Sequence, residues 1–270
     1  KIIIMEAPLE FAIGIDIGGT NTKFGIINHR GEISHRGEIS TTRHTEIEKF
    51  IDNLYESIKP AIKETGGDDL IKGIGVGAPN GNYYNGNIEY APNLPWKGII
   101  PLAKLINRKF KKPCTLTNDA NAAAVGEMMY GAARGMRDFI MITLGTGVGS
   151  GIIANGQLIL GHDGFAGELG HTVIRPGGRL HWGTGMRGTL ETYASATGIA
   201  ITANEMLDEK IKNSSSLRKI PRKKIDSKAV FEAAVSGDKI AKDVFKYTGR
   251  ILGEALSNFV MFSSPEAIIL

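Results

Sequence analysis

Leu144-Gly145-Thr146-Gly147-Val148-Gly149-Ser150-Gly151 is the stretch of this sequence that decides the fold. It lies between two apolar runs, residues 138–143 and 152–154. Short, β-branched runs bounded by turn signals predict buried strands. A glycine-rich turn between two strands presents backbone N–H groups with no Cβ to keep a ligand away, which suits phosphate oxygens. An ordinary glycine hairpin has the same sequence features, so this stretch alone leaves both interpretations open.

The same pattern occurs near the start of the chain. Residues 11–17 predict a strand, Gly18-Gly19-Thr20-Asn21 predicts a turn, and residues 22–27 predict a returning strand. Neither turn contains the Gly-Lys-Ser/Thr of a Walker loop, and neither has the strand–glycine–helix order of a dinucleotide fingerprint. Two such units predict two similar α/β half-domains that face one nucleotide. This is the arrangement of the actin-like ATPase (ribonuclease H-like) fold of sugar kinases.

Length and composition favour a cytoplasmic protein of two domains. The 270 residues suit two domains, which we place at residues 1–118 and 119–270. The net charge is only +4, and much of the basic excess lies in residues 210–228, so we expect no nucleic-acid partner. We expect no membrane partner, because no apolar run approaches about 18 residues and residues 1–5 are too short for a secretory segment. The only cysteine is Cys114, so an intrachain disulfide is impossible.

The second half of the chain contains several predicted helices. We expect one helix over residues 188–197 and another over residues 199–209, separated by Gly198. The basic stretch 210–228 predicts an exposed insertion, and residues 238–262 predict a long amphipathic helix. The sequence ends on a predicted buried strand, so we expect the second domain to be incomplete at its C-terminal end.

Asp16 is the candidate magnesium ligand. It ends a predicted buried strand beside the first glycine turn, where a carboxylate can hold Mg²⁺, usually through water. The alternative is an aspartate that only forms the turn. Lys23, on the returning strand, is either a phosphate contact or an exposed strand lysine.

Asp119 is the candidate catalytic residue. It begins a predicted helix, where aspartate is usually a cap. Thr117 or Asn118 can also supply the cap, which leaves Asp119 available. Phosphoryl transfer needs a group that orients the accepting hydroxyl, and that group is commonly an aspartate.

A set of polar residues could surround a polyol. His171 follows Glu168 by three positions after a glycine loop, and is a zinc ligand, a sugar contact or a core histidine. A structural zinc needs four nitrogen or sulfur ligands, so one histidine and one distant cysteine make a poor set. The full polar set consists of Asn80, Asn93, Asn118, Glu168, His171 and Glu191.

Taken together, these motifs resemble the ROK family of sugar kinases and repressors, and most closely its glucokinase branch. The resemblance runs from about Phe11 to Leu270 and rests on residues 16–23, 117–124, 144–151, 167–171 and 188–191. It implies that Asp119 is the catalytic base. It also implies that ATP and Mg²⁺ are bound by Asp16, Gly18, Gly19, Thr20, Asn21, Lys23, Gly145, Thr146 and Gly147. The sugar contacts that it implies are Asn93, Asn118, Glu168, His171 and Glu191, and we also expect a homodimer.

The sequence departs from the family in two places. Many members have three cysteines before the position of Glu191 and bind zinc with them and with the histidine that matches His171. The corresponding residues here are Trp182, Thr184 and Thr189, so we predict no structural zinc, with His181 and Trp182 packing part of that loop. The family also continues past the last strand with a glycine turn and helices that complete the adenine site.

The leading functional hypothesis is ATP-dependent phosphorylation of the terminal (6-) hydroxyl of a hexose, most specifically glucose. An N-acetylmannosamine or N-acetylglucosamine kinase is the alternative within the same class. A sugar-responsive repressor would need a helix-turn-helix before the kinase body, and only residues 1–10 precede the first predicted strand. A non-catalytic actin-like assembly protein has no need of Glu168, His171 and Glu191.

Overall fold

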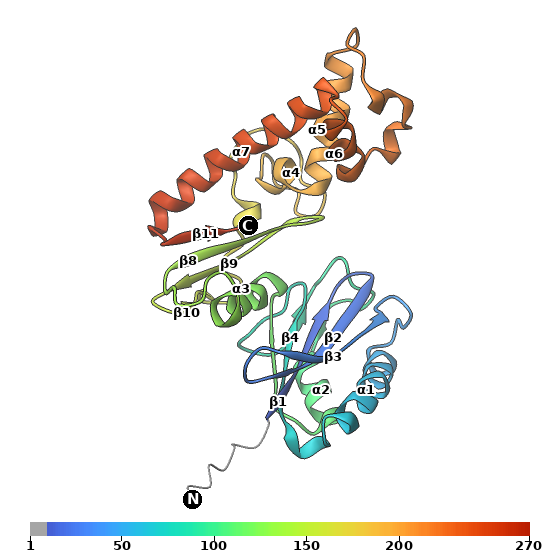
Figure 1. Cartoon of the computed structure of the whole chain (residues 1–270), viewed down its shortest axis with the longest axis vertical. Helices are drawn as coiled ribbons and strands as arrows, with labels where there is room; N and C mark the ends of the chain where they lie inside the picture. Colours follow the sequence, from blue (N-terminus) through green and yellow to red (C-terminus); the bar gives the residue numbers. More distant parts are fainter. Residues whose placement is uncertain (1–9) are drawn as a thin grey trace, which may run out of the picture. The chain divides into compact units, whose positions relative to one another are not determined.

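The computed structural model describes residues 10–270, which form two compact units (Figure 1). Unit 1 comprises residues 10–137 and 156–166, and unit 2 comprises residues 138–155 and 167–270. Residues 1–5, in which we found no secretory segment, lie outside the described residues. Among residues 10–270, no helix combines the length and the apolar composition that crossing a bilayer requires.

Unit 1 is built on a sheet with the strand order β3-β2-β1-β4-β7. β1 pairs with β2 and β2 with β3 in antiparallel fashion, whereas β4 is parallel to both β1 and β7. Helices α1 and α2 pack on this sheet, and α1 buries Phe50, Leu54 and Ile58, which recur every four residues on one face. The bounds are β1 Phe11–Ile17, β2 Asn21–Asn28, β3 Ile33–Ser40, α1 Ile47–Glu64, η1 Asp68–Leu70, β4 Ile71–Gly77, β5 Ile88–Glu89, β6 Ile99–Ile100, α2 Leu102–Phe110, β7 Cys114–Thr117, α3 Asp119–Tyr130 and β10 Gln157–Leu158.

The parallel strands of unit 1 bring three loops to one edge of the sheet. In the strand register Asp16 is opposite Gly77, and Gly77 is opposite Thr117. The carboxyl ends of β1, β4 and β7 therefore meet, and the loops that follow them carry the first glycine turn, Asn80 and Asp119.

Helix α3 packs against the end of β4. A Cβ added to Gly77 would lie 3.3 Å from the Cα of Asp119 and 3.2 Å from the Cβ of Ala122. This close approach holds α3 in unit 1, so the division into units falls after Arg137, later in the chain than the boundary that we predicted at residue 118.

The thiol of Cys114, at the start of β7, is half-buried. Desolvation by burial raises its pKa to about 12.

Unit 2 contains a hairpin of β8 and β9, which pair antiparallel, with β11 parallel to β8. Ile251, Ala255 and Phe259 of α7 form a core with Ile140 and Ile142 of β8, and Figure 1 shows α7 running along this sheet. The bounds are β8 Phe139–Leu144, β9 Val148–Ala154, η2 Leu169–His171, α4 Glu191–Ala194, α5 Ala196–Glu209, η3 Ser216–Lys219, η4 Arg222–Lys224, α6 Ser227–Val235, α7 Lys239–Ser263 and β11 Ala267–Ile269.

Two predictions for unit 2 need correction. The helix break lies at Ser195, whose side chain accepts a hydrogen bond from the Gly198 N–H, so Gly198 belongs to α5. Residues 210–228 are more than an exposed insertion, because Leu217 and Ile225 are buried in a core that also contains residues of α5, α6 and α7.

Candidate active site

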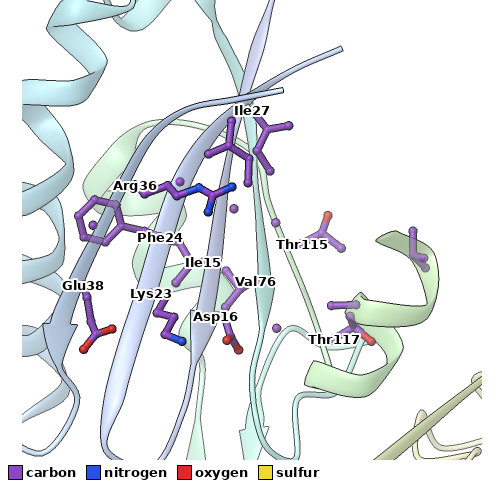
Figure 2. Close-up of a pocket in the computed structure, with 18 of the residues that line it drawn as sticks. Ile15, Asp16, Lys23, Phe24, Ile27, Arg36, Glu38, Val76, Thr115 and Thr117 are labelled. Carbon is purple, nitrogen blue, oxygen red and sulfur yellow. The ribbon is translucent and has the colours of Figure 1, made fainter. Parts of the chain in front are cut away.

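Asp16 belongs to a row of charged side chains across the sheet of unit 1. Lys23 is its register partner on β2, and Glu38 is the partner of Lys23 on β3 (Figure 2). Burial raises the pKa of the Asp16 carboxyl, the negative charge of Asp119 raises it further, and Lys23 lowers it. Asp119 is therefore close enough for its charge to act on Asp16, so two candidates from different loops share one edge of the sheet.

This pair of carboxylates fits the Mg²⁺ that we predicted at Asp16. Mg²⁺ prefers hard oxygen ligands and keeps several waters. Both aspartates are accessible to solvent, although the surrounding sheet partly desolvates the carboxyl of Asp16. The neighbouring charge of Asp119 disfavours the ionised form of Asp16, and a bound cation would remove that repulsion. The negative charge of Asp119, which raises the pKa of Asp16, is thus a charge that a metal ion would balance.

The first glycine turn lies against Asn93. The Gly18 N–H donates to the Asn21 carbonyl at 3.0 Å and closes the turn. A Cβ on Gly19 would lie 3.0 Å from the Asn93 carbonyl oxygen and 3.5 Å from the Asn93 Cβ. The structure thus brings a predicted sugar contact, Asn93, next to a predicted phosphate turn, and Thr20 is exposed at this turn.

Asn118 and Asp119 share one backbone donor at the start of α3. The Ala120 N–H donates to Asn118 Oδ1 at 2.9 Å and to Asp119 Oδ1 at 2.8 Å. Asn118 has the extended backbone of an N-cap, so the helix has a cap without Asp119, as we expected.

Asn80 already has a structural role in its loop. Its backbone is left-handed, with φ of 52°, a conformation that asparagine tolerates better than most residues. Its side-chain NH₂ donates to the Glu89 carbonyl at 2.9 Å. Asn80 remains a predicted sugar contact, but these features explain the residue without a ligand.

The second glycine turn is tied to the start of α5. The Ala196 N–H donates to the Gly145 carbonyl at 2.8 Å, and the Thr197 hydroxyl donates to the Thr146 carbonyl at 3.1 Å. A Cβ on Gly145 would meet nothing within 4 Å, whereas a Cβ on Gly147 would lie 2.5 Å from Glu191 Oε2. The backbone at Gly145 therefore faces open space, whereas the missing side chain of Gly147 makes room for the carboxylate of Glu191.

The predicted sugar contacts of unit 2 lie together. Glu168 Oε2 is 3.7 Å from His171 Nδ1, and a ring nitrogen of His171 lies within 4.8 Å of a Glu191 carboxylate oxygen. Ser150 holds the loop of Glu168 and His171: its hydroxyl donates to the Gly167 carbonyl and accepts from the Leu169 N–H. The central glycine stretch thus positions the loop that carries two of the three candidates.

His181 is the residue of this cluster that we did not predict. Its Nε2 lies 2.6 Å from Glu191 Oε1, and only 4% of its side chain is exposed. The sequence indicated only that His181 and Trp182 would pack in the loop, and their rings do stack at 4.7 Å. No spacing rule pairs a loop histidine with a glutamate ten residues later, so the sequence held no signal for this contact.

Comparison with known protein families identifies the family of this chain, because residues 12–270 match the sequence pattern of the ROK family.

The chain belongs to the ROK family.

Three ROK relatives are close enough to describe individually. The chain is 37% identical over 261 residues to a glucokinase of Halalkalibacterium halodurans, with 96% of this chain and 78% of the relative covered. It is 33% identical over 261 residues to a glucokinase of Thermotoga maritima, with 96% and 80% covered. The crystal structure of a ROK family glucokinase from Streptomyces griseus, in complex with glucose and AMPPNP, aligns with a TM-score of 0.77 at 32% identity, over 96% of this chain and 81% of that chain. The fold is therefore the actin-like ATPase fold of ROK sugar kinases, as we predicted.

The loop before Glu191 does not provide the ligands of a ROK-type zinc site. Trp182 is half-exposed and stacked on His181, and Thr184 and Thr189 carry hydroxyls in place of thiolates. The Thr189 hydroxyl is buried and has no hydrogen-bond partner among the described residues. Zinc in such sites needs thiolate or imidazole ligands, so this set of donors does not fit it.

Unit 1 of this ROK chain also contains a cavity that the sequence did not predict. It has a volume of about 880 Å³ on the face of the sheet, and Figure 2 shows its lining. Phe24, Ile27 and Val76 make its walls largely apolar, and it also includes Asp16 and Lys23.

Proposed function

We propose that this chain is an ATP-dependent kinase that phosphorylates the terminal hydroxyl of a hexose, with glucose as the leading substrate. The observation that carries the proposal is the proximity of Asp119 to Asp16 at the carboxyl edge of the unit 1 sheet. One carboxylate can serve the metal–phosphate group while the other serves the attacking hydroxyl. Membership of the ROK family and the similarity to glucokinases support the same reaction.

Asp119 would orient the hydroxyl that attacks the γ-phosphorus in line. A carboxylate is a weak base for an alcohol, but the transition state of phosphoryl transfer is loose, so the proton can leave late. Asp119 then accepts the proton once the oxygen has become acidic. The exposed position of Asp119 beside the cap residue Asn118 allows a substrate to reach it.

The two glycine turns and Asp16 would bind Mg²⁺-ATP. Mg²⁺ supplies positive charge to the phosphates when it is bound. Asp16 would hold the ion, most simply through water, and Lys23 adds a second positive charge on the neighbouring strand. The backbone N–H groups of the turns that begin at Gly18 and Gly145 would contact phosphate oxygens.

The sugar hydroxyls would be bound by carboxylates and an imidazole. Glu168, His171 and Glu191 lie together in unit 2, and Asn93 and Asn118 come from unit 1. Carboxylates accept hydrogen bonds from hydroxyls, and a neutral imidazole can donate or accept. Such a set distinguishes a sugar from an apolar ligand, because an apolar ligand would displace water from these polar groups without replacing its hydrogen bonds.

A coupled assay that measures ADP release tests the proposal. The panel contains glucose, mannose, N-acetylglucosamine and N-acetylmannosamine, each with Mg²⁺ and ATP. The highest kcat/KM is expected for glucose. A preference for either N-acetylhexosamine would replace glucose by that alternative substrate, and no turnover of any sugar would overturn the proposed function.

We also propose a homodimer that acts in the cytoplasm, where ATP is available. Light scattering coupled to size-exclusion chromatography should give twice the chain mass of 29.0 kDa. A mass of one chain across the working concentration range would contradict the dimer.

A further inference from the structure

The hydrogen bonds around His181 define which of its ring nitrogens carries the proton. His181 Nδ1 accepts from two backbone donors, the Gly183 N–H at 3.1 Å and the Thr184 N–H at 3.0 Å. A ring nitrogen that accepts must present its lone pair, so the proton of the neutral ring is on Nε2. His181 Nε2 therefore donates to Glu191 Oε1, 2.6 Å away.

Both oxygens of Glu191 are consequently held by donors within unit 2. Glu191 Oε2 accepts from the Val148 N–H at 2.7 Å, and Oε1 accepts from His181. The His181 ring is in turn fixed by the two loop N–H groups and by Trp182, which stacks on it at an interplanar angle of 23°. Only 12% of the Glu191 side chain is exposed, so its orientation depends on these partners.

We propose that His181 is a positioning residue. Its hydrogen bond orients the carboxylate of Glu191 toward the sugar. This inference rests on the proposed function, in which Glu191 contacts the substrate. His181 itself would touch Glu191 and not the sugar. The hydrogen bond from His181 fixes the geometry of this loop, as a bound metal ion would otherwise do.

The same tautomer argues against a metal ion in this cluster. The cluster offers three ligand atoms within 4.8 Å of one another, one each from His171, His181 and Glu191. This spacing is short enough for all three to coordinate one cation. A metal on His181 Nε2 would need the ring proton on Nδ1, where the two loop N–H groups already point. Binding would require an imidazolate or a rearranged loop, so hydrogen bonding explains the cluster better.

Two substitutions separate the positioning role from a role in holding the loop. His181→Asn keeps an acceptor near the place of Nδ1 but is too short to reach Glu191. His181→Gln places an amide near Nε2 and can still donate to the carboxylate. Circular dichroism and thermal melting should first show that both variants are folded.

The expected result is a change in the sugar KM alone. A lost hydrogen bond to a charged group typically corresponds to roughly tenfold or more in affinity, so the sugar KM of His181→Asn should rise at least tenfold. Its ATP KM and kcat should stay within about threefold of the parent, because the interaction binds substrate and transition state alike. His181→Gln should restore the sugar KM to within about threefold of the parent. A purely structural role predicts the reverse order, so any result in which Asn is no worse than Gln overturns the proposal.

Nuclear magnetic resonance of ¹⁵N-histidine-labelled protein gives a readout that does not depend on kinase activity. His181 should appear as the Nε2–H tautomer, and its Nε2–H resonance should shift in Glu191→Gln. If the parent phosphorylates no sugar, the proposed function fails while this spectrum still decides the His181–Glu191 contact. An Nδ1–H tautomer, or a resonance that Glu191→Gln leaves unchanged, would overturn the inference.

Discussion

Two adjacent side chains, Asn118 and Asp119, compete for one backbone donor at the start of α3. Because asparagine caps a helix about as well as aspartate, Asp119→Asn should keep the helix and melt within a few degrees of the parent. The substitution removes the negative charge and the basicity that proton transfer needs. We expect kcat to fall by about 10² or more, with little change in the sugar KM.

Asp69 offers a matched control for this experiment, because it is an exposed aspartate in another part of unit 1. Asp69→Asn should retain full turnover in the same coupled assay. A turnover of Asp119→Asn within about fivefold of the parent would refute its assignment as the base.

Asp16 should make stability depend on pH in a direction opposite to that of most aspartates. Its folded-state pKa is raised above 3.8, chiefly by burial and then by Asp119. The fold therefore disfavours the ionised form, so the contribution of Asp16 to the free energy of unfolding is full below pH 3.8 and is lost as the pH rises through the folded-state pKa. In thermal melts without Mg²⁺, the stability of Asp16→Asn relative to the parent should increase from about pH 4 to about pH 7.

The same variant should lose most of its Mg²⁺-dependent turnover, because its side chain can no longer offer an anionic oxygen. If Asp16→Asn became less stable relative to the parent as the pH rose, the described environment of Asp16 would be wrong.

The candidate residues were predictable to different degrees. Glu168 and His171 were chosen as candidates from their spacing after a glycine loop, and the structure places Glu168 beside His171 and His171 near Glu191. The contact of His181 with Glu191 could not be found, because it depends on how residues 181–185 turn back on themselves. Local sequence rules do not describe such a loop, whereas they describe a strand or a helix well.

At the scale of a structural element, the turn at Gly145 gives a selective test of ATP binding. An added Cβ at Gly145 would meet nothing within 4 Å, so we expect Gly145→Val to leave the fold nearly unchanged. If phosphate approaches this backbone closely, the branched side chain should raise the ATP KM by about tenfold or more and leave the sugar KM unaffected.

Gly249→Ala is a suitable control, because Gly249 lies within α7 and an added Cβ there also meets nothing within 4 Å. It should not change the ATP KM. An unchanged ATP KM in Gly145→Val would show that the turn does not bind phosphate.

The loop over residues 178–189 should be ordered without zinc. The positions of the family's cysteines carry Trp182, Thr184 and Thr189, and the loop is held by hydrogen bonds to His181 and by stacking. Elemental analysis of chelator-washed protein should give well under one zinc per chain, with the melting temperature unchanged by the chelator. Stoichiometric zinc that survives the wash would contradict both this prediction and the hydrogen-bonded arrangement of His181.

Elements with strong local signals were predicted well, and those that depend on distant packing were not. The hairpin of β1 and β2 was predicted almost to the residue, because its apolar runs and its glycine turn are contiguous. The helix break at Ser195 was missed because Gly198 looked like the stronger breaker, although a capping serine begins a helix more effectively. The basic composition of residues 210–228 concealed Leu217 and Ile225, whose burial depends on helices that come later in the chain.

At the scale of the whole molecule, substrate binding should be visible as stabilisation. A ligand at about 100 times its Kd adds about 2.7 kcal/mol to the free energy of unfolding, which for a chain of this size raises the melting temperature by roughly 5–10 °C. Saturating glucose should produce such a shift in the parent and little shift in Glu168→Gln. L-Glucose is the matched ligand control, and an equal shift with both enantiomers would exclude specific sugar binding.

The raised pKa of the half-buried Cys114 thiol has a practical consequence for measuring motion. Maleimides react with the thiolate, and a pKa of about 12 leaves almost none of it at neutral pH. The single native cysteine should therefore not be labelled by maleimide dyes and need not be removed. Exposed cysteines introduced at Glu56 in unit 1 and Glu232 in unit 2 would then carry a donor and an acceptor dye without a background signal. Energy transfer between them would follow the distance between the two units, molecule by molecule, as hexose and nucleotide are added.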